Sequence, residues 1–354
     1  MKKYLILFIS ALVLASCSNE VDTTPVKSSE KAVLKFSLSA APNLDSRGGI
    51  VLDADSTIYD CTILTFDLDG NISGKGYEAI SGGVARFDMQ VGLSTNRGDS
   101  CIVYAIANTN NPNLFDGVQN YDQFHSMFVS FDKPQDLVDG NIKIGNASLG
   151  YTSLTSNGQL MTTEAIKVKI TDGIVPFRLK LYSQSAKIKF TINAPTGDAI
   201  NGFRLKGYQL FMVPLSGYLD NRYKGIEPDA AFEAPGGTYG NYPRVNLAGD
   251  STVVHFTYYM NESHQGEQKS NPASSVKERT AAHAKPHPTY IEVYVADMAG
   301  KQGTYRYYLG NLTTDINNSK FNYYNILRGY DYYVTINLND IDDTDPRFSW
   351  DQAS

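Results

Sequence analysis

Few residues of this sequence have the spacing that metal binding requires. His283 and His287 lie four residues apart, which on a helix would aim both imidazoles at one metal, but Pro286 and Pro288 interrupt any such helix. The run Asp67–Asn71 resembles the start of a calcium loop, yet its glycine comes at position four, whereas that loop needs it at position six. We therefore expect a solvated loop at the histidines and a hairpin turn at the aspartates.

Other catalytic patterns are incomplete. Gly70–Lys75 is one residue short of a phosphate-binding loop and lacks the Ser or Thr that should follow the lysine, and no Gly-x-Ser-x-Gly sequence occurs. The acidic residues from Asp340 to Asp345 are typical of a solvated turn. The sequence predicts no enzyme, no cofactor and no metal site, although a glycosidase-type carboxylate pair could still form from residues distant in sequence.

The N-terminal segment predicts lipid attachment at Cys17. Lys2 and Lys3 precede the apolar run Tyr4–Leu14, which is about half of the roughly 20 residues that span a membrane. Leu14-Ala15-Ser16-Cys17 resembles the lipobox of bacterial lipoproteins. We predict a signal peptide at 1–16 and a lipid on Cys17, which would anchor the precursor to the outer membrane. The alternative is an ordinary signal peptide that contains a cysteine.

Two cysteines remain after Cys17, and each lies in a strand-like run. In an oxidising compartment Cys61 and Cys101 could form a disulfide between strands. They could equally be two separate buried thiols that pack as small hydrophobic groups. The sequence leaves both alternatives open, because a disulfide needs Cα atoms within about 7 Å of each other.

Strand patterns dominate the rest of the chain. Polar residues 17–31 predict a tether, and then Leu34, Phe36 and Leu38 alternate with polar residues as in a half-buried strand. Similar patterns predict strands at 58–68, 84–89, 101–107, 166–170, 177–181, 188–192, 203–213, 252–259, 290–295, 305–309 and 332–338. One short helix is expected within 120–129 and a long exposed loop at 261–288. A break at 195–202 divides the chain into a β-sandwich domain at 32–195 and another at 196–354.

Composition narrows the class of partner. The formal net charge is -6, and no basic stripe follows the backbone of a nucleic acid, so we expect no nucleic-acid partner. Tyr is abundant, with 24 residues against a single Trp, and Gly contributes 29 residues, which favours strands joined by turns. The abundance of Tyr and of Gly therefore favours an all-β fold.

Taken in order, several segments resemble the fimbrillin superfamily of Bacteroidetes, the subunits of type V pili. Besides the lipobox, the matching segments are Cys101–Asn108, Ser185–Lys189, Tyr259–Gly266 with Pro288–Tyr294 and Tyr307–Gly310, and Asn325–Leu338. In the last of these the family commonly has Asn after the arginine, whereas Arg328 is followed by Gly329. The departure leaves the other matches intact.

The resemblance implies two transthyretin-like (Ig-like, Greek-key) β-sandwich domains in tandem and assembly by strand exchange. An arginine-specific protease would cut between Arg47 and Gly48, and the first strand, 32–40, would then leave. The local sequence agrees, because Arg47 lies in a polar, glycine-flanked loop that a protease can reach. Loss of an amphipathic strand would leave an apolar groove with unpaired edges, which recruits a strand from another subunit.

The resemblance also implies a fimbrium on the cell surface, with other fimbrillin subunits, stalk or anchor, as partners and an unknown receptor on a host or bacterial surface. Stalk subunits carry donor strands after the last conserved strand, but here only Asn339–Ser354 remains, interrupted by Pro346. We therefore predict a tip position, with stalk and anchor as alternatives. A different class of function is a glycan-binding surface lipoprotein, not part of a pilus, that would use exposed tyrosines as platforms for sugars. Trp350 is the single indole available for such stacking.

Overall fold

The structure is a computed structural model. It describes residues 31–41, 43–45, 50–51, 56–96, 99–145, 147–148, 158–170, 176–194, 203–222, 231–310, 321–338 and 344–351. Within these residues the protein is almost entirely β-structure, so the predicted all-β class is confirmed. No helix in these ranges is long and apolar enough to cross a membrane.

The N-terminal strands form one eight-stranded sheet in the described part of the chain. Its order is β5-β4-β7-β11-β13-β1-β6, and β12 also pairs with β7. The strands are β1 (Lys31–Ala40), β4 (Ile58–Phe66), β5 (Ile72–Val84), β6 (Arg86–Asn96), β7 (Ser100–Ala107), β11 (Met161–Thr162), β12 (Ile166–Lys169) and β13 (Phe177–Ser183). The central strands β4 and β7 are buried on both faces, which explains the nearly continuous apolar sequence of β7; β4 also buries the polar residues Asp60, Thr62 and Thr65.

A smaller layer covers one face of β4 and β7. It contains the sheet β10-β9-β8-β17 and two short helices. Its elements are α1 (Tyr121–His125), β8 (Phe128–Ser130), α2 (Asp136–Asp139), β9 (Lys143–Ile144), β10 (Ala147–Ser148) and β17 (Ser216–Tyr218). The helix predicted within 120–129 is confirmed as α1, whose first turn is capped by the Asn120 side chain accepting from Gln123 N at 3.0 Å.

The C-terminal strands form two five-stranded sheets, β20-β14-β23-β2-β3 and β19-β15-β21-β22-β24. Their strands are β2 (Asn43–Asp45), β3 (Ile50–Val51), β14 (Ser185–Asn193), β15 (Arg204–Phe211), β19 (Val245–Ser251), β20 (Val253–Asn261), β21 (Tyr290–Ala296), β22 (Gln302–Tyr308), β23 (Tyr330–Asn337) and β24 (Phe348–Trp350). A two-residue pairing joins β16 (Val213–Pro214) to β18 (Tyr239–Gly240), beside the 3-10 turn η1 (Pro235–Gly237).

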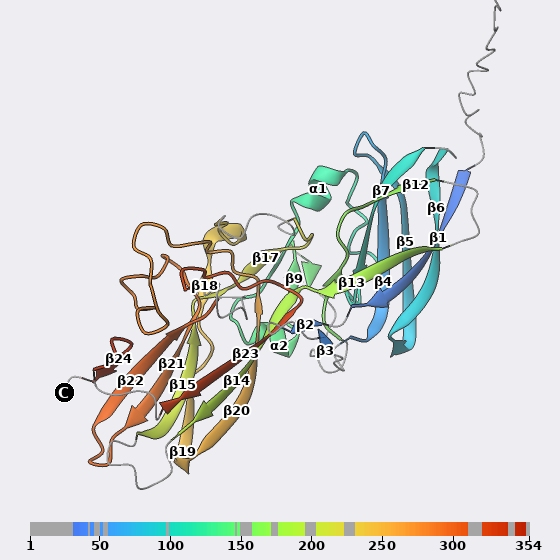
Figure 1. The fold of residues 1–354 in the computed structure, drawn as a ribbon. Helices are drawn as coiled ribbons and strands as arrows, with labels where there is room; N and C mark the ends of the chain where they lie inside the picture. The colour runs from blue at the N-terminus through green and yellow to red at the C-terminus, as the bar shows by residue number, and fades with distance from the viewer. Residues whose placement is uncertain are drawn as a thin grey trace, which may run out of the picture.

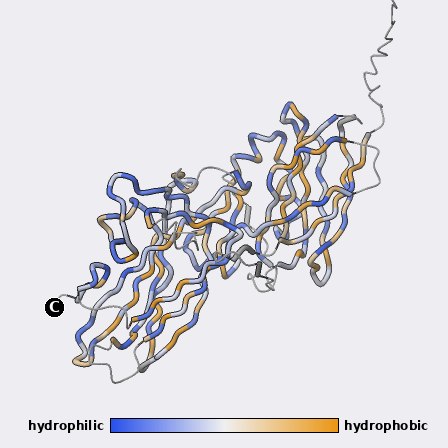
Figure 2. Tube along the Cα trace, in the orientation of Figure 1, coloured by the Kyte–Doolittle hydropathy of each residue, from blue (hydrophilic) through white to orange (hydrophobic). Residues whose placement is uncertain are grey.

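The strands of the N-terminal and C-terminal sheets gather at opposite ends of the molecule, and the smaller layer lies between them (Figure 1). Hydrophobic residues line the strands at both ends, whereas the loops are mostly hydrophilic (Figure 2). One hydrophobic core is formed by side chains of the eight-stranded sheet itself. A second lies between that sheet and the smaller layer, and a third lies between the two C-terminal sheets.

The chain first crosses from β1 to the C-terminal sheets at β2 and returns from β3 to β4, and it crosses again at Gln184, the single residue between β13 and β14. The domain boundary predicted after residue 195 stays a prediction. The prediction of an exposed loop over 261–288 is wrong for its first part, because residues 261–266 are buried. The hairpin turn predicted at Asp67–Asn71 is confirmed by a hydrogen bond from Gly70 N to Asp67 O of 3.1 Å and by a φ of 86° at Gly70.

Candidate functional site

The strand that the sequence predicts to be released is β1, and it occupies a slot inside the N-terminal sheet. It pairs in parallel with β13, with Phe36 opposite Phe177 and Leu38 opposite Leu179. On its other side it pairs antiparallel with β6, with Phe36 opposite Met89. β1 is therefore an internal strand of the sheet, although it is the first strand of the chain.

Side chains on one face of β1 supply part of the core. Ala32, Leu34, Phe36 and Leu38 are each at most 2% exposed, whereas Val33 on the opposite face is 56% exposed. The Phe36 ring lies 6.0 Å from that of Phe177. Burial of each of the larger side chains contributes about 1.5–3 kcal/mol, so β1 is held mainly by its alternating apolar face.

Removal of β1 would leave a gap with two strand edges facing it. In the described sheet β6 is joined to the other strands by its ladder with β1, and β13 borders the gap on the other side. Both edges would present unpaired N–H and C=O groups above an apolar trough. Such a gap favours insertion of another extended segment with the same alternation.

The segment after β1 reaches the C-terminal sheets. β2 pairs in parallel with β23, with Leu44 opposite Tyr330 and Asp45 opposite Asp331. β3 returns antiparallel to β2. The connection between β2 and β3 contains Arg47 and Gly48 and lies outside the described residues. A cut there would detach β1 and β2 together, and hence strands of both ends of the molecule.

Cys17 also lies outside the described residues, but the other two cysteines are placed. Both thiols are free and fully buried. Cys61 lies opposite Ala107 on β7, six residues from Cys101, which corresponds to about 20 Å along a strand. A disulfide between them is therefore excluded by distance, and the alternative of two separate buried thiols holds. Burial raises the pKa of both thiols, to about 11 for Cys101.

A second cluster joins two of the segments by which the chain resembles fimbrillins. Ser263 and Ile326 form a bridge, with both N–H to O distances at 2.8 Å. Gly266 N donates to the Asn325 side chain at 2.6 Å. Residues 259–266 and 325–338, which are unconnected in the sequence, are thus bound to each other just before β23.

The other two segments reach the same place. Gly329 N donates to Ser185 O at 3.0 Å, and Gly329 has a φ of 70°. Asn and Gly are the residues that adopt this left-handed conformation most readily, so the departure from the family's Asn is conformationally neutral. Asn108 Nδ2 donates to Gln159 O at 2.6 Å, and Gln159 Oε1 in turn accepts from Ser183 and Ser185.

An ion pair between Arg328 and Glu262 lies at the centre of this cluster, with both side chains at most 5% exposed. Burial alone would raise the pKa of Glu262, but the charge of Arg328 and the hydrogen bond from His264 (3.1 Å) outweigh it and lower this pKa to about 2. Glu262 is therefore a carboxylate at neutral pH.

The lowered pKa predicts acid sensitivity. The carboxylate has a pKa near 2 in the folded chain and an ordinary value of 4.5, so the unfolded chain binds its proton more readily. The stabilisation is complete above pH 4.5 and is lost as the pH falls toward 2, by about 3 kcal/mol for this group. Urea unfolding at several pH values should show this decline, and Glu262→Gln should flatten it. An equally steep decline in that variant would contradict the assignment.

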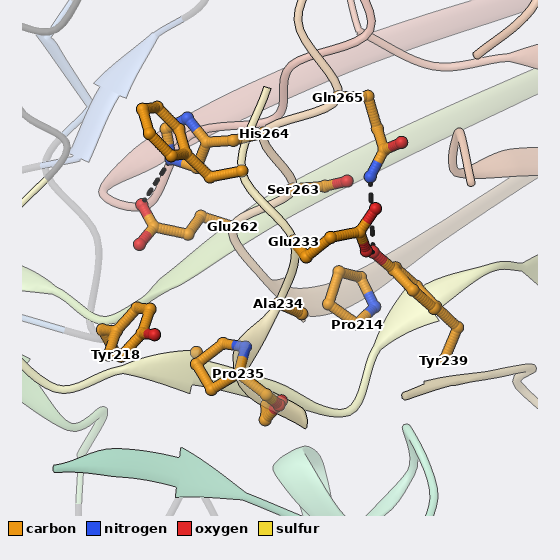
Figure 3. Close-up of a pocket in the computed structure, with 13 residues that line it drawn as sticks. Pro214, Tyr218, Glu233, Ala234, Pro235, Tyr239, Glu262, Ser263, His264 and Gln265 are labelled. Carbon is orange, nitrogen blue, oxygen red and sulfur yellow. Dashed lines mark hydrogen bonds and ion pairs between the residues drawn. The ribbon is translucent and has the colours of Figure 1, made fainter. Parts of the chain in front are cut away.

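A small surface pocket adjoins the ion pair and is lined by Glu262 and His264, among others (Figure 3). On its other side Tyr239 donates to Glu233 at 2.9 Å and accepts from Gln265 at 3.4 Å. The buried Ser263 hydroxyl in this wall has no hydrogen-bond partner among the residues that the structure describes. The free volume of the pocket, about 10 Å³, is far below the roughly 300–1,000 Å³ of typical ligand sites, so it has no room for a small-molecule ligand.

The residues considered for metal or sugar binding do not converge. His283 contacts Asn271 O, whereas His287 lies 3.7 Å from Glu233. Within the described ranges no three His, Cys, Asp or Glu side chains could share a metal. Trp350, the single indole available to the glycan-binding alternative, packs with Phe348 at 5.0 Å and lies under Lys301 Nζ at 4.5 Å.

The sequence did not single out Glu262, Arg328 or Gln184 as a cluster. Charged residues are normally exposed, and no local pattern indicates that Glu262 and Arg328 form a pair across 66 residues. The available signal was that Glu262 and Arg328 both lie in segments of the fimbrillin resemblance. That signal locates the residues but does not predict their contact.

Comparison with solved structures identifies the fold. A protein named for cell adhesion from Parabacteroides distasonis matches 90% of this chain and 96% of its own, with 16% identity and a TM-score of 0.56. The tip fimbrial protein Mfa3 from Porphyromonas gingivalis, solved with a C-terminal truncation, matches 92% and 99%, with 15% identity and a TM-score of 0.55. No family model and no curated protein matches the sequence. The chain shares the fold of these two proteins over nearly their whole lengths.

Proposed function

We propose that the chain is a structural and adhesive subunit of a type V fimbria, made as a lipoprotein on Cys17 and displayed at the cell surface. The observation that carries the proposal is the position of β1, an N-terminal strand that fills an internal slot between β13 and β6. The shared fold supports it, because one of the two matched proteins is a fimbrial tip protein and the other is named for cell adhesion.

In this proposal a protease cuts after Arg47, and a strand from a neighbouring subunit takes the place of β1. The incoming strand must present apolar side chains at alternate positions, as Leu34, Phe36 and Leu38 do. Its direction is also constrained if it follows β1, namely parallel to β13 and antiparallel to β6. A strand long enough to follow β2 would also pair with β23.

We further propose the tip position, and the C-terminal strand supports it. β24 pairs with β22, so that Phe348 is opposite Tyr305. Phe348 is buried, and its ring lies 4.9 Å from Phe203. Just before β24, Asp345 and Arg347 form an ion pair at 2.7 Å. A strand committed to its own sheet is a poor donor, so β24 is not expected to pair with a neighbouring subunit.

Strand exchange can be tested with the full chain, an arginine-specific protease and a labelled peptide of residues 32–40. We expect cleavage after Arg47, followed by peptide uptake with release of the native segment. Arg47→Gln should be neither cut there nor loaded, and a peptide with Phe36→Asp should not enter. Complete cleavage without uptake, or equal uptake by Arg47→Gln, would overturn strand exchange. Polymerisation of the cut protein by itself would overturn the tip position alone.

A further inference from the structure

Besides the earlier crossing through β2 and β3, the two ends of the molecule are joined by a very short covalent connection. β13 ends at Ser183 in the eight-stranded sheet and β14 begins at Ser185 in a C-terminal sheet. Only Gln184 lies between them, and it is 4% exposed. Its backbone N–H donates to Leu160 O at 2.8 Å, so its main chain is held by the N-terminal end. A one-residue connection leaves the orientation of the ends to the contacts around it, in addition to the pairing of β2 with β23.

Arg328 supplies contacts around this connection from the C-terminal end. It lies two residues before β23, and its Nη1 donates to Gln184 Oε1 at 2.6 Å. Its Nη2 donates to Tyr218 O at 2.7 Å, and Nη1 also contacts Leu219 O at 3.3 Å. Glu262, which follows β20, accepts from the same Nη2. One guanidinium therefore contacts the connection, the end of β17 and the end of β20.

The Tyr218 carbonyl makes this arrangement a link between the two ends. β17, which contains Tyr218, pairs antiparallel with β8, so that Tyr218 is opposite Phe128. Gln184 Nε2 donates to the same carbonyl at 2.5 Å. Arg328 and Gln184 thus bind one acceptor on the smaller layer, and that layer packs on the N-terminal sheet through Leu219, which is fully buried there.

We propose that the contacts of Arg328 fix the orientation of the C-terminal sheets relative to the N-terminal sheet. A planar guanidinium can donate to several acceptors in fixed directions, whereas an ammonium group cannot reproduce that geometry. Because the acceptors belong to different elements, bending at Gln184 would break charge-assisted hydrogen bonds in a buried site. Tension applied to one end of the molecule would then reach the other end without a hinge motion.

Arg279 provides a matched control within the same chain. It is also buried, and its guanidinium donates to the carbonyls of Tyr308 and Leu309 at 3.2 and 2.8 Å. It also donates to Phe321 and Tyr323, at 3.0 and 3.3 Å. All four acceptors belong to the C-terminal end, so Arg279 can stabilise that end but cannot fix its orientation.

Distances between two spin labels test the proposal in the full chain. In a chain with Cys17→Ser, Asp69→Cys and Met298→Cys place labels on exposed hairpin turns at opposite ends, while Cys61 and Cys101 are fully buried. We expect one narrow distance distribution in the parent protein. Arg328→Met with Glu262→Gln should broaden it by about twofold or more, since short linkers without a rigid interface permit relative motion. Arg279→Met should leave its width unchanged.

Arg328→Lys keeps a charge beside Glu262 and serves as the second variant if the double substitution does not fold. We expect it to broaden the distribution to an intermediate width, because one ammonium cannot bind Gln184, Tyr218 and Glu262 together. A width equal to that of the parent in a folded Arg328 variant would overturn the proposal. Equal broadening in Arg279→Met would also overturn it, since general destabilisation would then explain the effect.

Discussion

Phe36→Ala should lower the free energy of unfolding by about 3–5 kcal/mol, the range typical of a fully buried Phe replaced by Ala. The Phe36 side chain has no exposed surface and contacts the core between β13 and β6. Truncation leaves a cavity inside the sheet, where rigid neighbours on both sides cannot close it. Urea unfolding of the full chain, followed by circular dichroism, measures the change.

Val33→Ala on the opposite face is the matched control. Val33 is 56% exposed, so its truncation should change stability by less than about 0.5 kcal/mol. The same pair of variants tests function, because a weakened β1 should exchange faster with the labelled peptide after cleavage. Similar losses of stability in both variants would show that β1 is not held by its alternating face.

Arg328→Met should be the second substitution with a large effect, lowering the free energy of unfolding by about 3–5 kcal/mol. The side chain is 3% exposed at its ion pair with Glu262, and its removal leaves that carboxylate buried without its main counter-charge. The cost arises chiefly from the uncompensated charge. Urea unfolding at neutral pH measures it.

Replacement of Glu262 as well should recover part of this loss. A double-mutant cycle with Arg328→Met and Glu262→Met separates the penalty of the unpaired carboxylate from the lost hydrogen bonds to Gln184 and Tyr218. We expect the double variant to be more stable than Arg328→Met alone. Losses that simply add would mean that the two groups are not coupled, contrary to their contact.

The strands that bury one face were predictable from sequence because alternation is a local property. β1, β13 and β14 show it directly, and the structure has them at the predicted places. β5 was missed because it contains Gly74, Gly76, Gly82 and Gly83, which disfavour strands. The structure gives a reason for Gly74: a Cβ there would lie 2.7 Å from Gly92 O. Glycine permits β5 and β6 to approach each other.

Neither the position of β1 between β13 and β6 nor the contacts of Arg328 could be derived from local sequence patterns. The alternation of β1 predicts which face is buried, but not that β13, about 140 residues later, lies beside it. Arg328 and Glu262 look like surface residues, and their burial depends on how two distant loops meet at Gln184. Sequence reasoning located Arg47 in a polar break, and its cleavage stays a prediction.

The most direct test of a fimbrial role is N-terminal peptide mapping of the protein in filaments sheared from its native cells. We expect a chain that begins at Gly48, without β1, β2 or the lipid on Cys17, because a strand from a neighbouring subunit would occupy the slot between β13 and β6. A chain in the filaments that still begins at lipid-modified Cys17 would contradict strand exchange at Arg47, and absence of the protein from the filaments would contradict the fimbrial role itself.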